Sequence, residues 1–167
     1  MKIFKKLLYI LPLSILVPLL LPTTAFATQF HFKSFTLSQE ETVNEDIYAV
    51  GDTVRIDGVV NGDAVVVADV IQVNGTITGD TYLIGSKIDV DANIYGNTFI
   101  FSNNTSLRGV LTGNTYIASS FINYNAEAEK DLTAFFLESN MKGSVGDDLR
   151  AFGLRSTVDS TVRGDLL

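Results

Sequence analysis

The feature that most constrains this chain is an aspartate or asparagine at every seventeenth position from residue 46 onward. The positions follow one another without insertion or deletion and are Asp46, Asp63, Asp80, Asn97, Asn114, Asp131, Asp148 and Asp165. Because chance agreement over eight consecutive positions is negligible, this is an internal repeat. Such a repeat predicts an array in which each unit packs only against its neighbours.

Glycine follows the same register. All 13 glycines lie within the repeat, and 12 of them fall in three columns. Five directly precede the Asp/Asn position, four lie twelve residues after it, and three lie five residues after it. Since glycine permits tight corners and close backbone approach, three glycine columns predict three corners in each unit.

The segments between the corners read as short strands. One unit contains Thr81–Ile84, then the alternating Ile88–Val90, then a stub around Ile94. The segments are β-branched and aromatic, and no window has helical periodicity. The sequence therefore predicts an all-β parallel β-helix, or β-solenoid, of about seven 17-residue coils with three short strands each. Successive coils are expected to stack about 4.8 Å apart.

The first strand of each coil is apolar on both of its faces. One set of columns contains Tyr48 and Val50 with their equivalents, and the set between them contains Ala49 with its equivalents. Either set can point inward, and the other is then exposed or covered. The residues Tyr48, Tyr82, Phe99 and Tyr116 form a candidate association stripe. The alternatives are ordinary aromatic stacking on an exposed sheet and cover by a loop.

The first 27 residues differ from the repeat. Three lysines precede an apolar run at residues 7–21, and Ala25 and Ala27 follow it. This pattern predicts a secretory signal peptide over residues 1–27, with an uncleaved membrane anchor as the alternative. Cleavage lowers the formal net charge from −7 to −10. The sequence thus predicts an exported protein, periplasmic, surface-bound or extracellular, that repels nucleic acid and anionic lipid. Membrane contact is expected only if this segment is retained or the chain is longer.

The two ends of the repeat carry separate expectations. Residues 28–45 read as a degenerate first coil that caps the N-terminal side, with Leu37 and Val43 placed in apolar columns by a step of 17. Residues 46–167 form the β-helix. At the other end, Leu166 and Leu167 are the candidate assembly edge for strand addition, and the alternative is a natural chain that continues beyond them.

The Asp/Asn column has two interpretations. Stacked carboxylates could bind Ca²⁺, whereas Asp and Asn also serve as turn residues that bond their own backbone. Asn97 and Asn114 favour the turn, because they keep the hydrogen bond and lose the charge. No catalytic triad, carboxylate pair or phosphate loop can be placed on one face, and His31 lies outside the main repeat. We therefore expect no enzymatic activity, no metal and no cofactor.

The repeated pattern resembles that of the bactofilins, the polymer-forming cytoskeletal proteins. The clearest matches are Asp46-Ile-Tyr-Ala-Val-Gly51 with Ile56-Asp-Gly58, and Val145 to Gly153. The resemblance covers about three-quarters of the chain and implies a right-handed parallel β-helix that polymerises end to end without nucleotide. Bactofilins are cytoplasmic and carry polar tails, whereas this chain begins with a signal peptide, which favours an exported relative.

These observations predict a self-assembling structural or scaffold protein at the cell envelope or outside the cell. Its expected partner is a further copy of itself, or an envelope protein or polysaccharide. The alternative is a surface binding module that holds polysaccharide or a protein partner on the aromatic stripe or on the polar second strand. A β-helix hydrolase or lyase is the weakest alternative.

Overall fold

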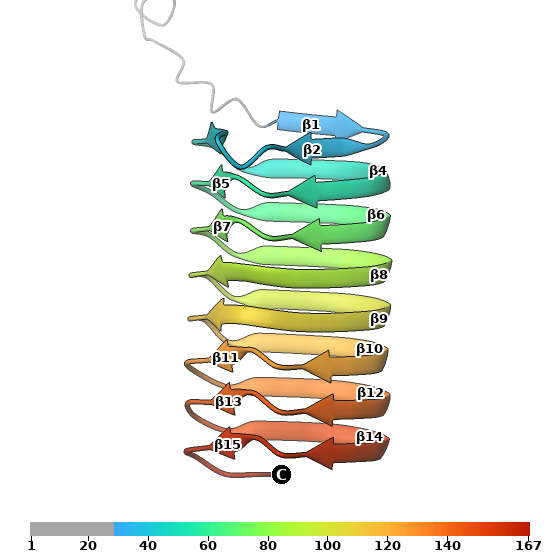
Figure 1. Cartoon of the computed structure of the whole chain (residues 1–167), viewed down its shortest axis with the longest axis vertical. Helices are drawn as coiled ribbons and strands as arrows, with labels where there is room; N and C mark the ends of the chain where they lie inside the picture. Colours follow the sequence, from blue (N-terminus) through green and yellow to red (C-terminus); the bar gives the residue numbers. More distant parts are fainter. Residues whose placement is uncertain (1–28) are drawn as a thin grey trace, which may run out of the picture.

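The computed structural model describes residues 29–167, and every regular element in them is a β-strand (Figure 1). The all-β prediction is therefore confirmed for this part of the chain. The predicted signal peptide at residues 1–27, with its apolar run at 7–21, lies outside the described residues. No helix within residues 29–167 has the length and apolar character needed to cross a membrane.

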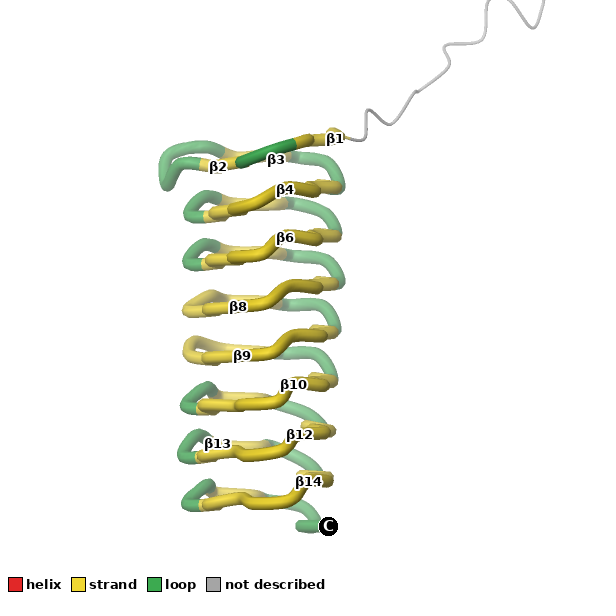
Figure 2. Tube along the Cα trace, turned by 90° about the vertical axis from the view of Figure 1, so that its right-hand side faces the viewer, coloured by secondary structure: helices red, strands yellow, loops and turns green. Residues whose placement is uncertain are grey.

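The strands stack in sequence order as about eight coils (Figures 1 and 2). The first coil contains β1 (Gln29–Phe32), β2 (Phe35–Leu37) and β3 (Thr42–Val43). The later coils contain the long strands β4 (Ile47–Ile56), β6 (Ala64–Val73), β8 (Thr81–Ile94), β9 (Thr98–Leu111), β10 (Thr115–Tyr124), β12 (Leu132–Met141) and β14 (Leu149–Val158). Their short strands are β5 (Val59–Val60), β7 (Thr76–Ile77), β11 (Glu127–Ala128), β13 (Ser144–Val145) and β15 (Thr161–Val162).

The coils pair in parallel with a constant step. From Ile47 onward every paired residue lies 17 positions from its partner, as in Ile47 with Ala64 and Thr98 with Thr115. The chain crosses the far side from left to right and returns along the near side as it descends, which is a right-handed winding (Figure 1). The β-solenoid prediction is confirmed, with the period that the Asp/Asn column indicated.

The strands differ from the expected three short pieces per coil. The first two pieces join into one bent strand of 10 residues in β4, and in β8 and β9 the third piece joins as well, giving 14 residues. Pairing continues through the corner, where Gly51 lies beside Ala68. Because the ladder forms between coils and every coil bends at the same place, a bend does not interrupt it.

The bent strands give the solenoid two broad outer faces. We call the first face the outer side of the first four residues of each long strand, such as Thr98–Phe101 in β9. The second face is the outer side of the following segment, such as Asn104–Leu107 in the same strand. The short strands close the third side (Figure 1).

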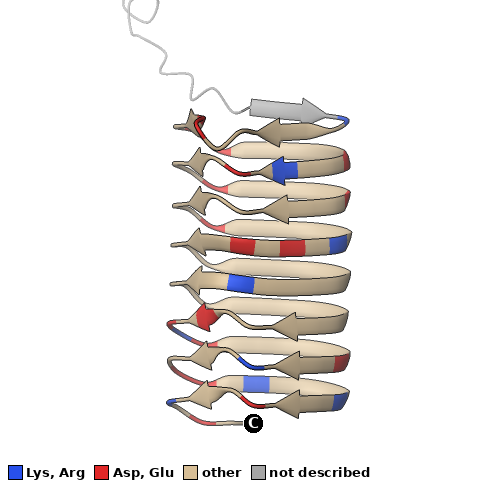
Figure 3. Ribbon diagram, viewed as in Figure 1, with Lys and Arg blue, Asp and Glu red and all other residues tan. Residues whose placement is uncertain are grey.

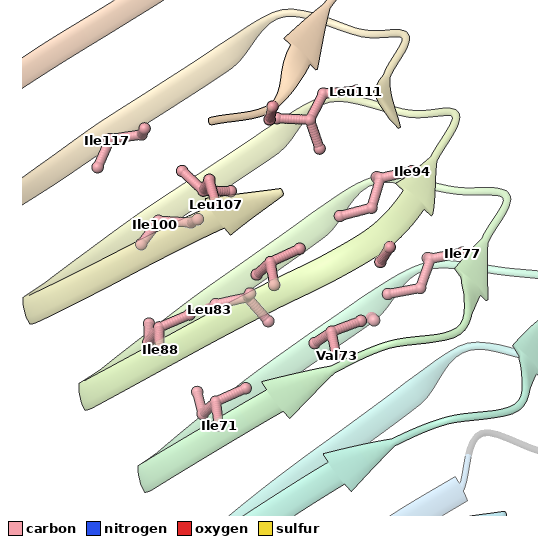
Figure 4. Close-up of a cluster of buried hydrophobic side chains, with 14 of the residues drawn as sticks. Ile71, Val73, Ile77, Leu83, Ile88, Ile94, Ile100, Leu107, Leu111 and Ile117 are labelled. Atoms are coloured by element: carbon pink, nitrogen blue, oxygen red, sulfur yellow. The ribbon is translucent and has the colours of Figure 1, made fainter. Parts of the chain in front are cut away.

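The hydrophobic core fills the space between these sides. Ile71, Leu83, Ile88 and Leu107 are at most 1% exposed and point inward, as Figure 4 shows. Each buried side chain of this size contributes about 1.5–3 kcal/mol relative to an exposed one. One coil cannot bury its own apolar side chains, so the coils stabilise one another by stacking.

The structure decides which columns of the first strand point inward. The set that contains Ala49 is buried, together with the set that contains Ile47, and the set that contains Tyr48 and Val50 faces outward. The inward positions in β6 are Ala64 and Val66. The inward side of this strand carries Ala, Val, Leu, Ile and Thr and its aromatic columns lie outside, whereas Tyr124 is fully buried at the end of the second segment in β10.

The first coil departs from the 17-residue register. Gln29 pairs with Ile47, a step of 18, and Leu37 pairs with Ile56, a step of 19. The step of 17 returns where Val43 pairs with Val60. The sequence-based column for Val43 is therefore correct, and the column for Leu37 is wrong by two residues. The cause is the connection after Leu37, where residues 38–41 lie opposite only residues 57–58 of the next coil. The corner at Lys33, which has a φ of 91°, is one residue shorter than its equivalent and reduces the step to 18 in β1.

Candidate functional site

The Asp/Asn column forms a hydrogen-bond ladder between coils. The Oδ1 of Asp46 accepts the backbone N–H of Asp63 at 2.9 Å, and the Oδ1 of Asp63 accepts that of Asp80 at 2.8 Å. The same bond recurs from Asn97 to Asp80, Asn114 to Asn97, Asp148 to Asp131 and Asp165 to Asp148. The sequence-based expectation was a bond within each residue's own turn, and these bonds instead join one coil to the next.

One arginine neutralises part of this column. Arg150 donates from Nη1 to Asp131 at 3.0 Å and from Nη2 to Asp148 at 2.6 Å. The bond from Arg150, helped by the backbone N–H of Asp148, lowers the pKa of Asp131 below its usual value of 3.8. Within residues 29–167, no group of three or more His, Cys, Asp or Glu side chains could hold a metal ion. The geometry of the column accounts for register between coils, and no donor cluster in it favours Ca²⁺.

The first face is a continuous apolar surface. The rings of Tyr82, Phe99 and Tyr116 stack with centroid distances of 4.8 and 5.0 Å and are nearly parallel. These residues of the candidate association stripe therefore form one aromatic ladder across β8, β9 and β10, at the spacing of the coils. Tyr48, the fourth predicted member, lies in the same outward column two coils away, with Val65 between it and Tyr82.

A second outward column widens this apolar surface. Phe101 is 65% exposed, and Phe135 and Phe152 are stacked with their ring centroids 5.2 Å apart. Phe101 and Phe135, together with the aromatic ladder, border a shallow apolar groove of about 330 Å³. Figure 3 shows that the far-side strands that form this face carry almost no charged residue. An apolar surface that spans several coils is typical of an interaction site.

The second face is polar and contains several ion pairs. Arg108 contacts Asp89 at 2.7 Å and Asp91 at 3.1 Å, which raises the pKa of the arginine. Arg55 pairs with Asp57 and donates to Gln72 at 2.9 Å. Several Lys, Arg, Asp and Glu residues lie on the near side of the coils (Figure 3). The ion pairs join positions within a coil and between neighbouring coils, so they also favour the observed register.

The candidate assembly edge lies at the last coil. Leu166 forms a parallel bridge with Leu149, and the backbone N–H of Ala151 donates to the carbonyl of Leu167 at 2.9 Å. Both leucines are more than half exposed. They therefore extend the first side of the solenoid by one short strand below β14, whereas the rest of β14 has no further strand beside it among the described residues.

Comparison of the chain with protein-family models, with curated proteins and with solved structures found no match. The resemblance to bactofilins therefore rests on the repeat pattern alone.

One exposed aromatic residue lies among polar side chains and was not identified from the sequence. Phe121 is 48% exposed and lies on the polar second face, where it pairs in register with Asn104 and Glu138. Strand alternation already places it outward, in the column that contains Lys87 and Asn104. An aromatic residue in an outward column that is polar apart from Val70 is the signal that could have identified it.

Proposed function

We propose that this chain is a non-enzymatic structural module that assembles by stacking its coils on those of further copies, as the resemblance to bactofilins implies. The observation that carries the proposal is the uniform pairing, in which every coil after Ile47 pairs in parallel at the same step of 17 residues. Stacking uses backbone groups that are alike in all coils. The edge of one coil therefore suits a coil of a second copy.

An exposed inward residue in the last coil supports the placement of the contact between copies at β14. Val158, in β14, is 39% exposed, whereas Val90, in the same inward column, is fully buried. An added coil would cover this side chain and would pair the free backbone groups of β14. The apolar first face would strengthen the assembly by giving adjacent copies a second surface to bury.

The place of action in this proposal is the cell envelope or its outside. It is supported by the predicted signal peptide at residues 1–27 and by the charge of −10 that remains after its removal. Like charge on all copies opposes random aggregation, so the proposed assembly depends on the matched coil edges rather than on general attraction.

Electron microscopy and sedimentation velocity of the chain without residues 1–27 test the proposal. We expect filaments or sheets, and their loss when Leu166 and Leu167 are both changed to Lys, since charge at the edge opposes strand addition. The matched control is Leu137→Lys, because Leu137 is 53% exposed and lies two coils away from this edge. A strictly monomeric protein would contradict assembly, and unchanged filaments in the double variant would exclude this edge.

A further inference from the structure

The second face carries a shallow polar groove that the proposed assembly does not use. It has a volume of about 480 Å³, crosses β8, β9, β10 and β12, and reaches Thr157 of β14. Asn104 and Ser106 provide short side chains on its floor, and Phe121 is exposed beside them. Four coils give the groove a length of roughly 14 Å along the axis of the solenoid.

The asparagines of the groove differ from Asn61 and Asn74, whose amides are bonded to a neighbouring coil. Asn61 donates to Asn44 at 2.8 Å and Asn74 donates to Asp57 at 2.7 Å, so those amides are bonded between coils. Within residues 29–167, the side-chain amides of the groove have no hydrogen-bond partner: Asn104, Asn123 and Asn140. Asn123 and Asn140 are register neighbours on adjacent strands. They therefore present donors and acceptors to solvent at the spacing of the coils.

Phe121 provides an apolar surface among these amides. Its ring has no stacked aromatic neighbour among the described residues, in contrast to Tyr82, Phe99 and Tyr116 on the first face. An exposed ring can cover the C–H face of a sugar, and amides can both donate to and accept from its hydroxyl groups.

The charges around the groove are balanced. Lys87 lies at one end and Glu138, paired with Arg155, lies toward the other. Arg108 is shared by Asp89 and Asp91. A groove without net charge favours an uncharged ligand. The negative net charge of the whole chain disfavours a polyanion. We propose that this groove binds a neutral oligosaccharide, with Phe121 under a sugar ring and the three asparagines bonded to its hydroxyl groups.

Affinity electrophoresis tests this proposal, with the chain without residues 1–27 run in gels that contain soluble neutral polysaccharides: a β-glucan, a xylan and a mannan. We expect retardation by at least one of them. Phe121→Ala and the pair Asn123→Ala with Asn140→Ala should each weaken binding about tenfold, because each removes contacts worth on the order of a stacked ring or two hydrogen bonds. The matched control is Phe101→Ala, which removes an exposed phenylalanine from the other face and should leave binding unchanged.

The proposal is overturned if none of the three polysaccharides retards the chain, or if Phe121→Ala and Phe101→Ala weaken binding equally. Retardation by polygalacturonate alone, lost in Lys87→Ala, would also overturn it in favour of an anionic ligand. Sedimentation velocity of the same variants reports assembly separately. Failure of the sugar site and failure of the assembly are therefore distinguishable.

Discussion

The same strands build two outer faces of opposite character. Within β9, Phe99 and Phe101 lie on the apolar first face, and Asn104 and Ser106 lie on the polar second face. Both segments pair with β8 and β10 in the same register. The backbone ladder and the buried columns therefore stabilise the fold on both sides, and the outward columns are free to differ. The outward residues of this solenoid therefore depend on what the protein contacts, and the inward residues depend on how it folds.

The largest effects on stability are expected from substitutions in the core that lies between the two faces. Leu83 lies inside the first face and Ile88 inside the second, and both are at most 1% exposed. Leu83→Ala and Ile88→Ala should each lower the free energy of unfolding by about 2–5 kcal/mol, because each leaves a cavity between two neighbouring coils. Chemical denaturation measures both. Equal losses support one shared core, and a loss confined to one variant would show that the faces are stabilised separately.

A smaller effect should separate the two exteriors. Phe99→Ala removes the middle ring of the aromatic ladder and should destabilise the chain by about 1 kcal/mol, since stacked pairs contribute 0.5–1.5 kcal/mol beyond their buried area. Asn104→Ala, on the same strand but on the second face, should change stability by less than about 0.5 kcal/mol. Denaturation midpoints of the two variants give the comparison. An equal cost would mean that the ladder does not stabilise the monomer.

The interior behind the apolar first face also contains polar side chains. Behind the apolar first face lies a buried column with three stacked threonines, Thr81, Thr98 and Thr115, whose hydroxyl oxygens have no hydrogen-bond partner within the described residues. Thr98→Val keeps the shape and removes one of these hydroxyls. We expect a stabilisation of about 1 kcal/mol, measured by chemical denaturation, because an unsatisfied buried polar group is costly. Destabilisation would show that the hydroxyl is bonded in solution.

The smallest expected effect is a loss of thermal stability at low pH. The pKa values of Asp131 and Asp57 are lowered, first by their bonds to Arg150 and Arg55 respectively. A group with a lowered folded pKa stabilises the protein above its unfolded pKa, and this contribution is lost as the pH falls through the folded value. We expect a small drop in melting temperature below about pH 4. Arg150→Met should reduce this drop and Arg163→Met should not, and equal drops in all three proteins would contradict the assignment.

Much of the architecture was predictable because a solenoid repeats in one dimension. A residue and its equivalent 17 positions later lie side by side, so the column of Asp46 and the inward column of Ile71 could be assigned from spacing alone. The first coil was harder, because two extra residues between Leu37 and Thr42 make Leu37 pair two positions away from its expected partner. A register shift of this kind leaves no periodic signal.

The candidate sites depended on information that spacing does not contain. The outward direction of Tyr48 rather than Ala49 follows from the width of the interior. The exposure of the Phe121 ring depends on the side chains beside it on adjacent strands, which are those of Asn104 and Glu138. Which asparagines are bonded, such as Asn61, and which are not, such as Asn123, is a matter of side-chain geometry.

The sequence by itself determined the period, the parallel stacking and the position of the corners, because backbone pairing at a constant step forces equivalent residues into columns. Only the tertiary structure decided which face of the first strand is buried, that the aspartates bond between coils, and which side chains stand unpaired on the second face. These outcomes depend on the space inside a closed coil and on contacts between neighbouring coils. A periodic pattern specifies which residues are neighbours, whereas packing specifies what those neighbours can do.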